Sequence, residues 1–354
     1  MATYRFILAA ALAAFTQAAA AQSPAAAAEA DPDAYFKGQM GGTFGKNIID
    51  VMPAAKRVAV ASFRVAFITD NSVSAQVRGS YLPGRDTSGA RSSLYVALKG
   101  VEPKTFQAIA DKAYADLLTQ LAASGREVVP MDQMTDFFAS VNATPSDAAR
   151  PYTKTHNGQT AAFFAPSGMP LVFTHFDGAW GDRGAFDLNN YRRLEEYSYK
   201  WKAAVIAPLL VVNFAKMSSS GNQSGLVART AETGAELSMS VAALQSFYSR
   251  ADEFRNGMAM GGDQGGFSLI APIASPLTFG TLQKTAQEDN VGVKSVFDVL
   301  GKAAGLANAG GAARSTTRSV AETSDAAYAA AAEDALRRMG TTLAAWFKKY
   351  PPAN

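Results

Sequence analysis

Cysteine is absent from this chain of 354 residues, and histidine occurs only at His156 and His175. A protein without cysteine has no disulfides to stabilise it and no thiol to carry a lipid anchor. Charge of one sign is also scarce, since 33 Lys and Arg residues stand against 30 Asp and Glu residues and the formal net charge is +3. This balance, without any basic run, argues against the basic face that nucleic-acid binding requires.

Familiar catalytic motifs are missing as well. The chain has no G-x-S-x-G nucleophile elbow, no H-E-x-x-H zinc motif and no P-loop. The glycine-rich segment GGDQGG, at 261–266, lacks the spacing of a dinucleotide-binding loop and is typical of a flexible turn. The sequence therefore favours a protein that acts without catalysis.

The amino-terminal segment MATYRFILAAALAAFTQAAAAQ resembles an export signal. Its single positive charge, at Arg5, precedes an apolar run from Phe6 to Phe15, and small residues continue to Ala21. This order predicts a secretory signal peptide over residues 1–21. The apolar run is too short for a transmembrane helix, which needs about 20 residues.

The rest of the chain divides into a leader and one domain. Residues 22–50 are rich in Ala, Pro and acidic residues at their start, and we expect a flexible leader there. Residues 51–354 are predicted to form an α/β domain with loop-rich insertions at about 142–190 and 303–325. No later apolar run reaches spanning length, so we expect no transmembrane segment and a mature protein that is periplasmic or secreted.

The order of helix and strand patterns predicts the fold class. Over the first half of residues 56–70 both faces are mostly apolar, as in a central strand covered on two sides. Apolar residues recur at three- and four-residue spacing over 103–123, which predicts a helix that ends before Gly125. A short strand at 126–131 and a helix over 132–141 follow, so parallel strands with crossover helices are implied.

The later segments are assigned in the same way. Residues 71–98 are predicted to be a polar loop region that could hide a hairpin. A helix is predicted at 189–201, followed by buried strands at 202–219 and 234–250 that form a hairpin-like pair. The segment 265–279 is predicted to be an edge strand or irregular, and 325–350 a long amphipathic helix. The sequence thus predicts an α/β fold with a mixed, mostly parallel sheet covered by helices, a loop-rich insertion and a long C-terminal helix.

Two stretches of this pattern carry a family resemblance. RVAVASF, followed by IADKAYADLLTQLAASGREVVPMDQMTDFF, is similar to the curli-secretion-channel type domain and its relatives in the TolB amino-terminal group. The resemblance covers about 60 residues and includes a long C-terminal helix by element order. The secretion channel is lipidated, however, and this chain has no cysteine. The resemblance therefore implies the periplasmic scaffold of that family without its pore, and no catalytic residues carry over.

The glycine-rich segment THFDGAWGDRGAFDLNNY contains regularly spaced carboxylates. Asp177, Asp182 and Asp187 recur every five residues, just after His175. Such a loop could place several oxygen ligands around Ca²⁺, and His175 beside Asp177 could act in acid–base chemistry. The alternative is a solvated loop whose Asp side chains cap turns, and the sequence favours this alternative.

The run NNYRRLEEYSYKW offers a second candidate for ligand binding. Its aromatic and basic side chains could stack on sugar rings or form a protein interface. These candidate residues are Tyr191, Arg192, Arg193, Tyr197, Tyr199 and Trp201. At helical spacing several of the aromatic residues also form a stripe that is typical of core packing, which the pattern favours.

These observations predict an exported, non-catalytic cell-envelope protein that acts as a binding or assembly scaffold, with an envelope protein or a surface polymer as partner. The competing hypothesis is a hydrolase of an envelope glycan or peptide that uses carboxylates of the loop 175–187. An enzyme should gather such groups in one pocket, whereas a scaffold should scatter them.

Overall fold

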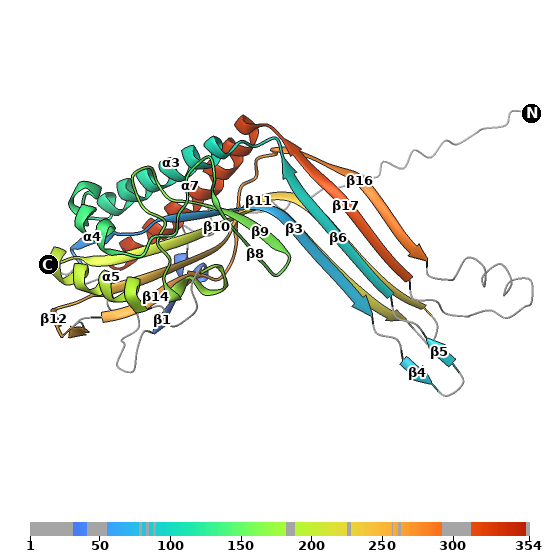
Figure 1. Ribbon diagram of the computed structural model, residues 1–354, viewed down its shortest axis with the longest axis horizontal. Helices are drawn as coiled ribbons and strands as arrows, with labels where there is room; N and C mark the ends of the chain where they lie inside the picture. Colours follow the sequence, from blue (N-terminus) through green and yellow to red (C-terminus); the bar gives the residue numbers. More distant parts are fainter. Residues whose placement is uncertain are drawn as a thin grey trace, which may run out of the picture.

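The computed structural model describes residues 31–40, 55–77, 80–82, 85–87, 90–181, 188–224, 228–256, 258–260, 263–291 and 313–351. These residues form a mixed α/β structure built on one large sheet of 13 strands (Figure 1). Helices pack against one end of this sheet, and several of its strands continue well beyond the helices. The fold class is therefore mixed α/β, as predicted.

The main path of the sheet contains eight strands. In the order in which they pair, these are β1 (Phe36–Met40), β14 (Asp263–Leu269), β11 (Ala228–Arg250), β10 (Ala204–Ser224), β3 (Arg64–Val77), β6 (Ala90–Lys99), β17 (Ala313–Thr323) and β16 (Gly280–Val291). The strands off this path are β2 (Arg57–Val60), β7 (Glu127–Val128), β8 (Tyr152–His156), β9 (Gln159–Phe164) and β15 (Ile273–Ala274). Two small hairpins are separate, β4 (Ser80–Leu82) with β5 (Arg85–Thr87) and β12 (Glu253–Arg255) with β13 (Met258–Met260).

The helices follow the predicted order. The described α-helices are α3 (Pro103–Ala123), α4 (Thr135–Ser140), α5 (Leu188–Trp201) and α7 (Asp325–Lys349), and the 3₁₀ turns are η1 (Pro32–Ala34), η3 (Met131–Met134) and η4 (His175–Trp180). Helix α3 begins with Pro103 in its first turn, where a missing amide proton costs nothing. Gly125 follows its end with φ +84°, a conformation that favours glycine. The apolar stripe predicted for α3 is buried, including Ile109, Leu117 and Leu121.

The core lies on both faces of the sheet at the helical end. Val58 and Val60 of β2 join the apolar cluster that contains the buried faces of α3 and α7. Ala59 and Ala61 join a second cluster with residues of α4 and α5. The segment RVAV is therefore a central strand covered on two sides, as its sequence predicts. We name this end of the molecule the body.

The pairing of the strands is more antiparallel than the sequence predicts. Parallel pairs among the described strands are β2 with β7, β10 with β2, β10 with β3, and β17 with β6. The remaining pairs, including the long hairpins β10–β11 and β16–β17, are antiparallel. The prediction of a mostly parallel sheet is therefore not confirmed, because long hairpins such as β3–β6, β10–β11 and β16–β17 make many of the neighbouring strands antiparallel.

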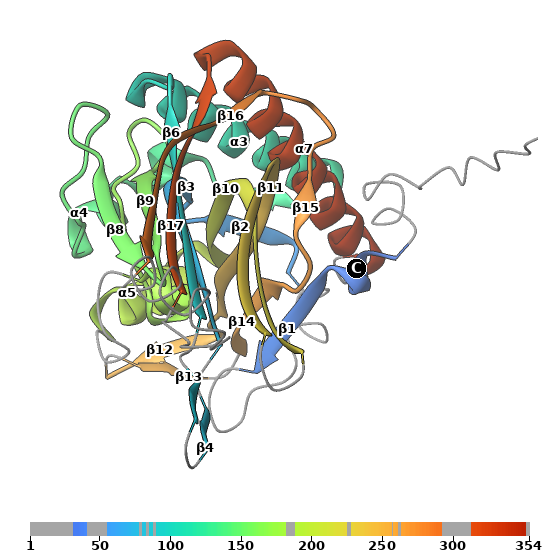
Figure 2. The same cartoon turned by 90° about the vertical axis from the view of Figure 1, so that its right-hand side faces the viewer.

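A long extension of the sheet leaves the body. We call it the arm, and it consists of residues 70–77 of β3, 90–99 of β6, 213–224 of β10 and 228–239 of β11, together with β16 and β17. Figure 1 shows these strands running past the helices to the far end of the molecule, and Figure 2 shows the arm from that end, with α3 and α7 above the strands.

Four segments differ in part from the sequence predictions. Most of the described part of 71–98, predicted to be a polar loop region that could hide a hairpin, belongs to the long hairpin formed by β3 and β6, so the hairpin alternative is confirmed. Residues 265–269 of the segment 265–279 belong to β14, which is not an edge strand because it lies between β1 and β11, whereas residues 270–279 are irregular apart from β15, as the alternative predicts. Within the predicted flexible leader, residues 36–40 form strand β1. The predicted segment 303–325 is described only from residue 313, where it forms β17 and enters α7.

Candidate functional site

The two outer edges of the arm are the most prominent candidate site. Within the described part of the chain, β16 pairs only with β17 and leaves its other edge open over 12 residues. The outer edge of β11 pairs with β14 and β15 from residue 240 onward, and the carbonyl oxygen of Met239 accepts a hydrogen bond from the amide of Ser275, so the unpaired edge there covers residues 228–238. An unpaired edge offers backbone N–H and C=O groups to a further strand.

These edges have little of the protection that edge strands usually carry. Both are longer than a typical strand of about 5 to 6 residues. The side chains of β16 from Thr281 to Gln287 are all exposed, and they include Leu282, an apolar side chain with 38% exposure. Lys284 is the one basic residue of β16. Lysine, proline and very short length are common means of blocking an edge, and β16 combines great length with a single lysine.

Small and polar side chains hold the arm together. The β10–β11 hairpin lies close to the β3–β6 hairpin, where Asn71 Nδ2 donates to Asn213 Oδ1 at 2.7 Å. Further out, the hydroxyl oxygens of Ser92 and Thr233 are 2.9 Å apart. A Cβ atom added at Gly221 would lie 2.8 Å from a methyl group of Val77, so glycine allows the hairpins to approach there. The arm is therefore an ordered, mostly polar structure.

A buried ion pair lies within the body, at the start of β3 and ahead of the arm, which begins at residue 70. Arg64 at the start of β3 contacts Asp177 in η4, and both side chains have 0% exposure. Arg64 Nη2 donates to the carbonyl oxygen of Ala207 at 2.5 Å, and the amide of Thr174 donates to Asp177 Oδ2 at 2.5 Å. Burial raises the pKa of the Asp177 carboxyl, while the charge of Arg64 opposes that rise. The pair connects η4 to strands β3 and β10.

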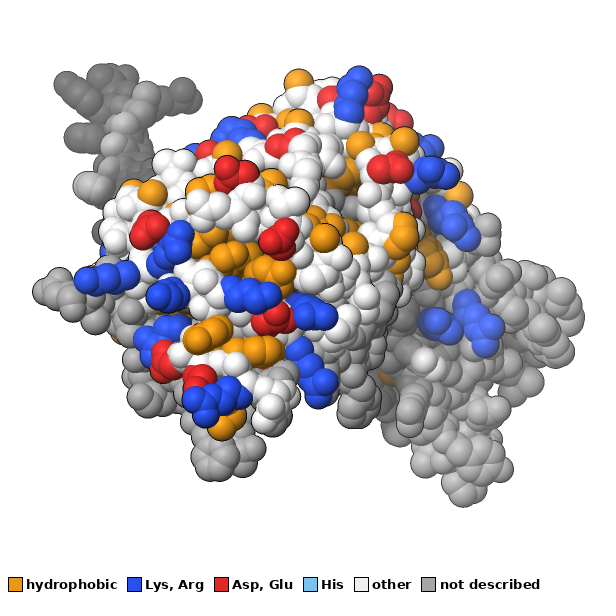
Figure 3. Space-filling view, turned by 60° about the vertical axis from the view of Figure 1, so that its left-hand side comes forward, with side chains coloured by type: hydrophobic (Ala, Val, Ile, Leu, Met, Phe, Trp, Pro, Cys, Tyr) orange, Lys and Arg blue, Asp and Glu red, His pale blue; other side chains and the backbone are white. Residues whose placement is uncertain are grey.

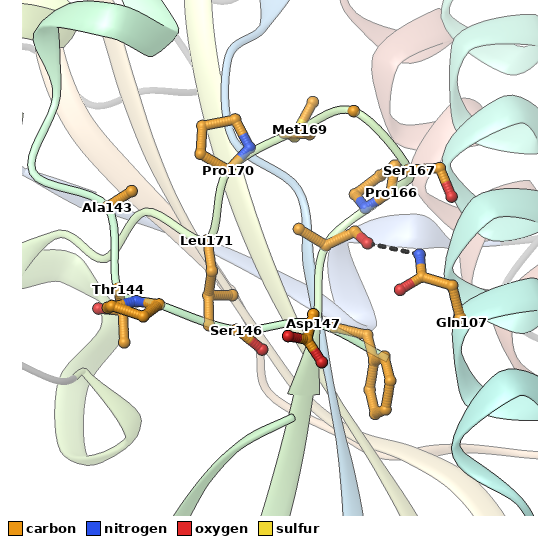
Figure 4. A pocket seen from close by; sticks show the side chains of 14 residues that line it. Gln107, Ala143, Thr144, Ser146, Asp147, Pro166, Ser167, Met169, Pro170 and Leu171 are labelled. Atoms are coloured by element: carbon orange, nitrogen blue, oxygen red, sulfur yellow. Dashed lines mark hydrogen bonds between the residues drawn. The ribbon is translucent and has the colours of Figure 1, made fainter. Parts of the chain in front are cut away.

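A cavity of about 400 Å³ lies beside α3 (Figure 4). Its walls are two chain segments, 143–147 and 164–171, and the side chain of Gln107, whose amide nitrogen donates to the carbonyl oxygen of Ala165 at 2.8 Å. Asp147 is the one carboxylate among its lining residues, and it accepts hydrogen bonds from the amides of Ala149 and Arg150. The cavity therefore lacks the paired carboxylates that a hydrolase of the predicted kind would need.

The predicted aromatic site lies on α5, and the structure separates its residues. Tyr197 is buried and packs with Trp201 against Phe137, with ring centroids 5.3 and 5.6 Å from that ring. Tyr191 packs on Phe247. These three side chains belong to the core cluster under α4 and α5, as the packing alternative predicts.

The surface part of that site is small. Tyr199 is 43% exposed, Arg192 is exposed, and Arg193 forms an ion pair with Glu196 at 2.6 Å. Figure 3 shows the left-hand end of the molecule, where Lys and Arg side chains lie among acidic and apolar ones. This end of the molecule therefore shows no uniform charge that would select a ligand.

The predicted acidic loop is only partly described. Asp177 is committed to Arg64, whereas Asp182 and Asp187 and the side chain of His175 lie outside the described residues. No group of three potential metal-ligating side chains occurs in the described part of the chain. A Ca²⁺ site at this loop remains a prediction, and it would have to form without the buried carboxylate of Asp177.

Comparisons with known proteins identify no matching family model, no curated relative and no solved structure of similar fold. Among the described helices, none is both long and apolar enough to cross a membrane.

Sequence reasoning missed the arm. Its strands contain many Ser, Thr, Gln and Gly residues, and their apolar alternation is too weak to separate a strand from a loop. One signal was present in the region 71–98, where the residues 72–77 alternate polar and apolar side chains as SVSAQV. That alternation continues the preceding strand, and it could have predicted a longer β3.

Proposed function

We propose that this chain is a non-catalytic assembly scaffold of the cell envelope, which associates with further strands through the open edges of its arm. The observation that carries the proposal is the pair of long unpaired edges, β16 and residues 228–238 of β11. Strand addition to such an edge is a common mode of protein association, in which backbone hydrogen bonds supply affinity. The periplasmic scaffold implied by the family resemblance is compatible with this role.

The two edges differ, and this difference suggests how copies would associate. One copy offers β16 and the other offers β11, so pairing of these unlike edges would be heterologous and could continue from copy to copy. Pairing of like edges would instead stop at a dimer with two-fold symmetry. A partner protein with its own exposed strand would use one edge alone.

Cysteine cross-linking can test this proposal, because the native chain has no cysteine. Gln283→Cys places one thiol on β16, and Ala235→Cys places one on the edge segment of β11. Each variant is treated alone and in a mixture with a short bis-maleimide reagent. Unlike-edge pairing predicts cross-linked dimers mainly in the mixture, and like-edge pairing predicts them in a single variant. Ala115→Cys, on the exposed face of α3, is the matched control.

A second variant tests the edge of β16 without a cross-linking reagent. Leu282→Lys adds a charge to the open edge of β16 and should reduce the molar mass seen by light scattering at a given concentration. Ile270→Lys changes another exposed apolar side chain, 56% exposed, away from the arm and should leave the mass unchanged. A protein that is monomeric at all concentrations, yields no cross-links and recovers no stoichiometric partner from envelope extract would contradict the proposal.

A further inference from the structure

One exposed face of the arm carries arginines in an unusual arrangement. In the parallel register of β6 and β17, Arg91 lies opposite Arg314, and Tyr95 lies opposite Arg318. All four side chains are exposed, Tyr95 by 43%. The guanidinium carbon of Arg318 lies 5.2 Å from the centre of the Tyr95 ring, within the range of a cation–π contact.

The Arg91–Arg314 pair departs from the charge pattern of the rest of the arm. On the same two strands Lys99 lies opposite Glu322, and in the β10–β11 hairpin Lys216 lies opposite Glu236. Side chains directly opposite each other on neighbouring strands are about 5 Å apart, and like charges at that distance are destabilising. The arrangement therefore has an energetic cost that the other cross-strand pairs avoid.

Acidic neighbours do not offset this positive charge in the described structure. The ion pairs found among the described residues include none of Arg91, Arg314 and Arg318. By register the nearest acidic residue is Glu288, opposite Thr316 on β16, and its side chain lies outside the described residues. Among the described side chains, therefore, none of the three arginines forms an ion pair with a carboxylate.

We propose that this face of the arm binds an acidic polysaccharide. One carboxylate of the polymer bridges the guanidinium groups of Arg91 and Arg314, and a second reaches Arg318. Arginine suits this task because its planar group can donate two parallel hydrogen bonds to a carboxylate. The two arginine positions are four residues apart along β17, which corresponds to about 13 Å, so the ligand must carry its charges along an extended chain.

The surroundings favour a polysaccharide over an acidic peptide. Strand β6 pairs with β3 on one side and β17 on the other, so its backbone has no free edge for a peptide strand at this place. The side chains beside the arginines on β3 are Ser74 and Gln76, both exposed and able to hydrogen-bond to hydroxyl groups. A flat face with polar side chains between the charges matches a polymer rich in hydroxyls.

A membrane surface fits less well. An interfacial contact would need several apolar side chains beside the basic ones. Tyr95 is the one large apolar side chain among the exposed residues that neighbour these arginines in register. The proposal is independent of the assembly proposal, because it concerns the face of inner strands and not the strand edges.

Binding of polygalacturonate to the full chain tests the inference. Titration calorimetry at low salt should show binding that weakens as salt is added, since the contact is a surface charge contact. Arg91→Gln and Arg314→Gln should each reduce the affinity about tenfold, as expected for loss of one charge-assisted contact. Arg150→Gln removes another exposed arginine, 90% exposed and outside the arm, and should leave the affinity unchanged.

Further measurements separate the alternatives. Without ligand, Arg91→Gln should keep or raise the melting temperature, because it removes repulsion from Arg314. A lower melting temperature would show that Arg91 has a structural role and would overturn the inference. Equal affinity for polyglutamate, binding only to vesicles that contain phosphatidylglycerol, or polygalacturonate binding that survives both Gln substitutions would each overturn it as well.

Discussion

The buried ion pair between Arg64 and Asp177 permits the sharpest prediction about stability. Both side chains are fully buried, and each is held by one further hydrogen bond to the backbone, at Ala207 and at Thr174. Removal of one partner leaves the other as an uncompensated buried charge, which costs about 3 to 5 kcal/mol. We therefore expect Asp177→Leu to lose stability in that range at neutral pH.

The two single variants should respond differently to pH. In Arg64→Met the remaining carboxyl of Asp177 can take up a proton, whereas the guanidinium left in Asp177→Leu stays charged at every usable pH. Burial raises the pKa of Asp177, and loss of Arg64 removes the charge that opposes this rise. A carboxyl with a raised folded-state pKa contributes stability below its unfolded-state pKa, and this stability is lost as pH rises through the folded-state value.

The two variants should therefore differ in how their stability changes with pH. Arg64→Met should regain stability as pH falls from neutral toward about 4, relative to the native chain, and Asp177→Leu should show no such recovery. The double variant should be less destabilised than either single variant, because it leaves no buried charge. Urea unfolding monitored by circular dichroism gives the midpoints and slopes for these comparisons.

Two results would refute this reasoning. Single variants that each cost less than about 1 kcal/mol, a typical value for an exposed ion pair, would mean that the pair is hydrated and not buried. A double variant whose loss equals the sum of the single losses would mean that the two side chains do not interact energetically.

Other predictions concern local geometry. In thermal unfolding, Gly100→Ala should lower stability by about 2 kcal/mol or more, because φ is +89° and the new Cβ would lie 2.0 Å from a backbone oxygen. Gly125 also has a positive φ, +84°, but no atom lies near the position of a new Cβ. Gly125→Ala should therefore cost only about 1 kcal/mol in the same assay. Burial tends to raise the pKa of Asp334, but hydrogen bonds from Ser275, Arg338 and a neighbouring arginine outweigh it and lower the pKa. Asp334→Asn should therefore be less stable than the native chain at neutral pH, and melting curves should show this gap closing as pH falls below the ordinary aspartate pKa.

Much of the body could be predicted from sequence, and the arm could not. The helices over 103–123 and 325–349 have strong apolar stripes, and the residues of these stripes, such as Ile109 and Leu117, form their buried faces. The strand at 57–60 is apolar on both faces and was recognised for that reason. In each case the local pattern reports burial in a core, which is the property that sequence periodicity measures.

The arm depends on contacts that no local pattern contains. Strand β17 pairs in parallel with β6, although more than 200 residues separate them in the chain, and the side chains of β17 are largely Ser, Thr and Arg. The prediction of a mostly parallel sheet failed for the same reason. The direction of neighbouring strands depends on which distant segments pair, and local sequence patterns do not contain that information. The arginine pair was equally invisible, since Arg91 and Arg314 become neighbours only through this register.

The arm is made of strands that begin in the core of the body. Strands β3, β10 and β11 are continuous from the apolar core into the polar arm, and the Arg64–Asp177 pair lies in the core part of β3. The arm has few buried apolar side chains of its own, so its order must come from backbone pairing that the body fixes in register. The polar composition of its strands is therefore tolerable only because the strands start from a rigid core. An arm built in this way can present exposed backbone edges and charged faces without having to supply its own hydrophobic core.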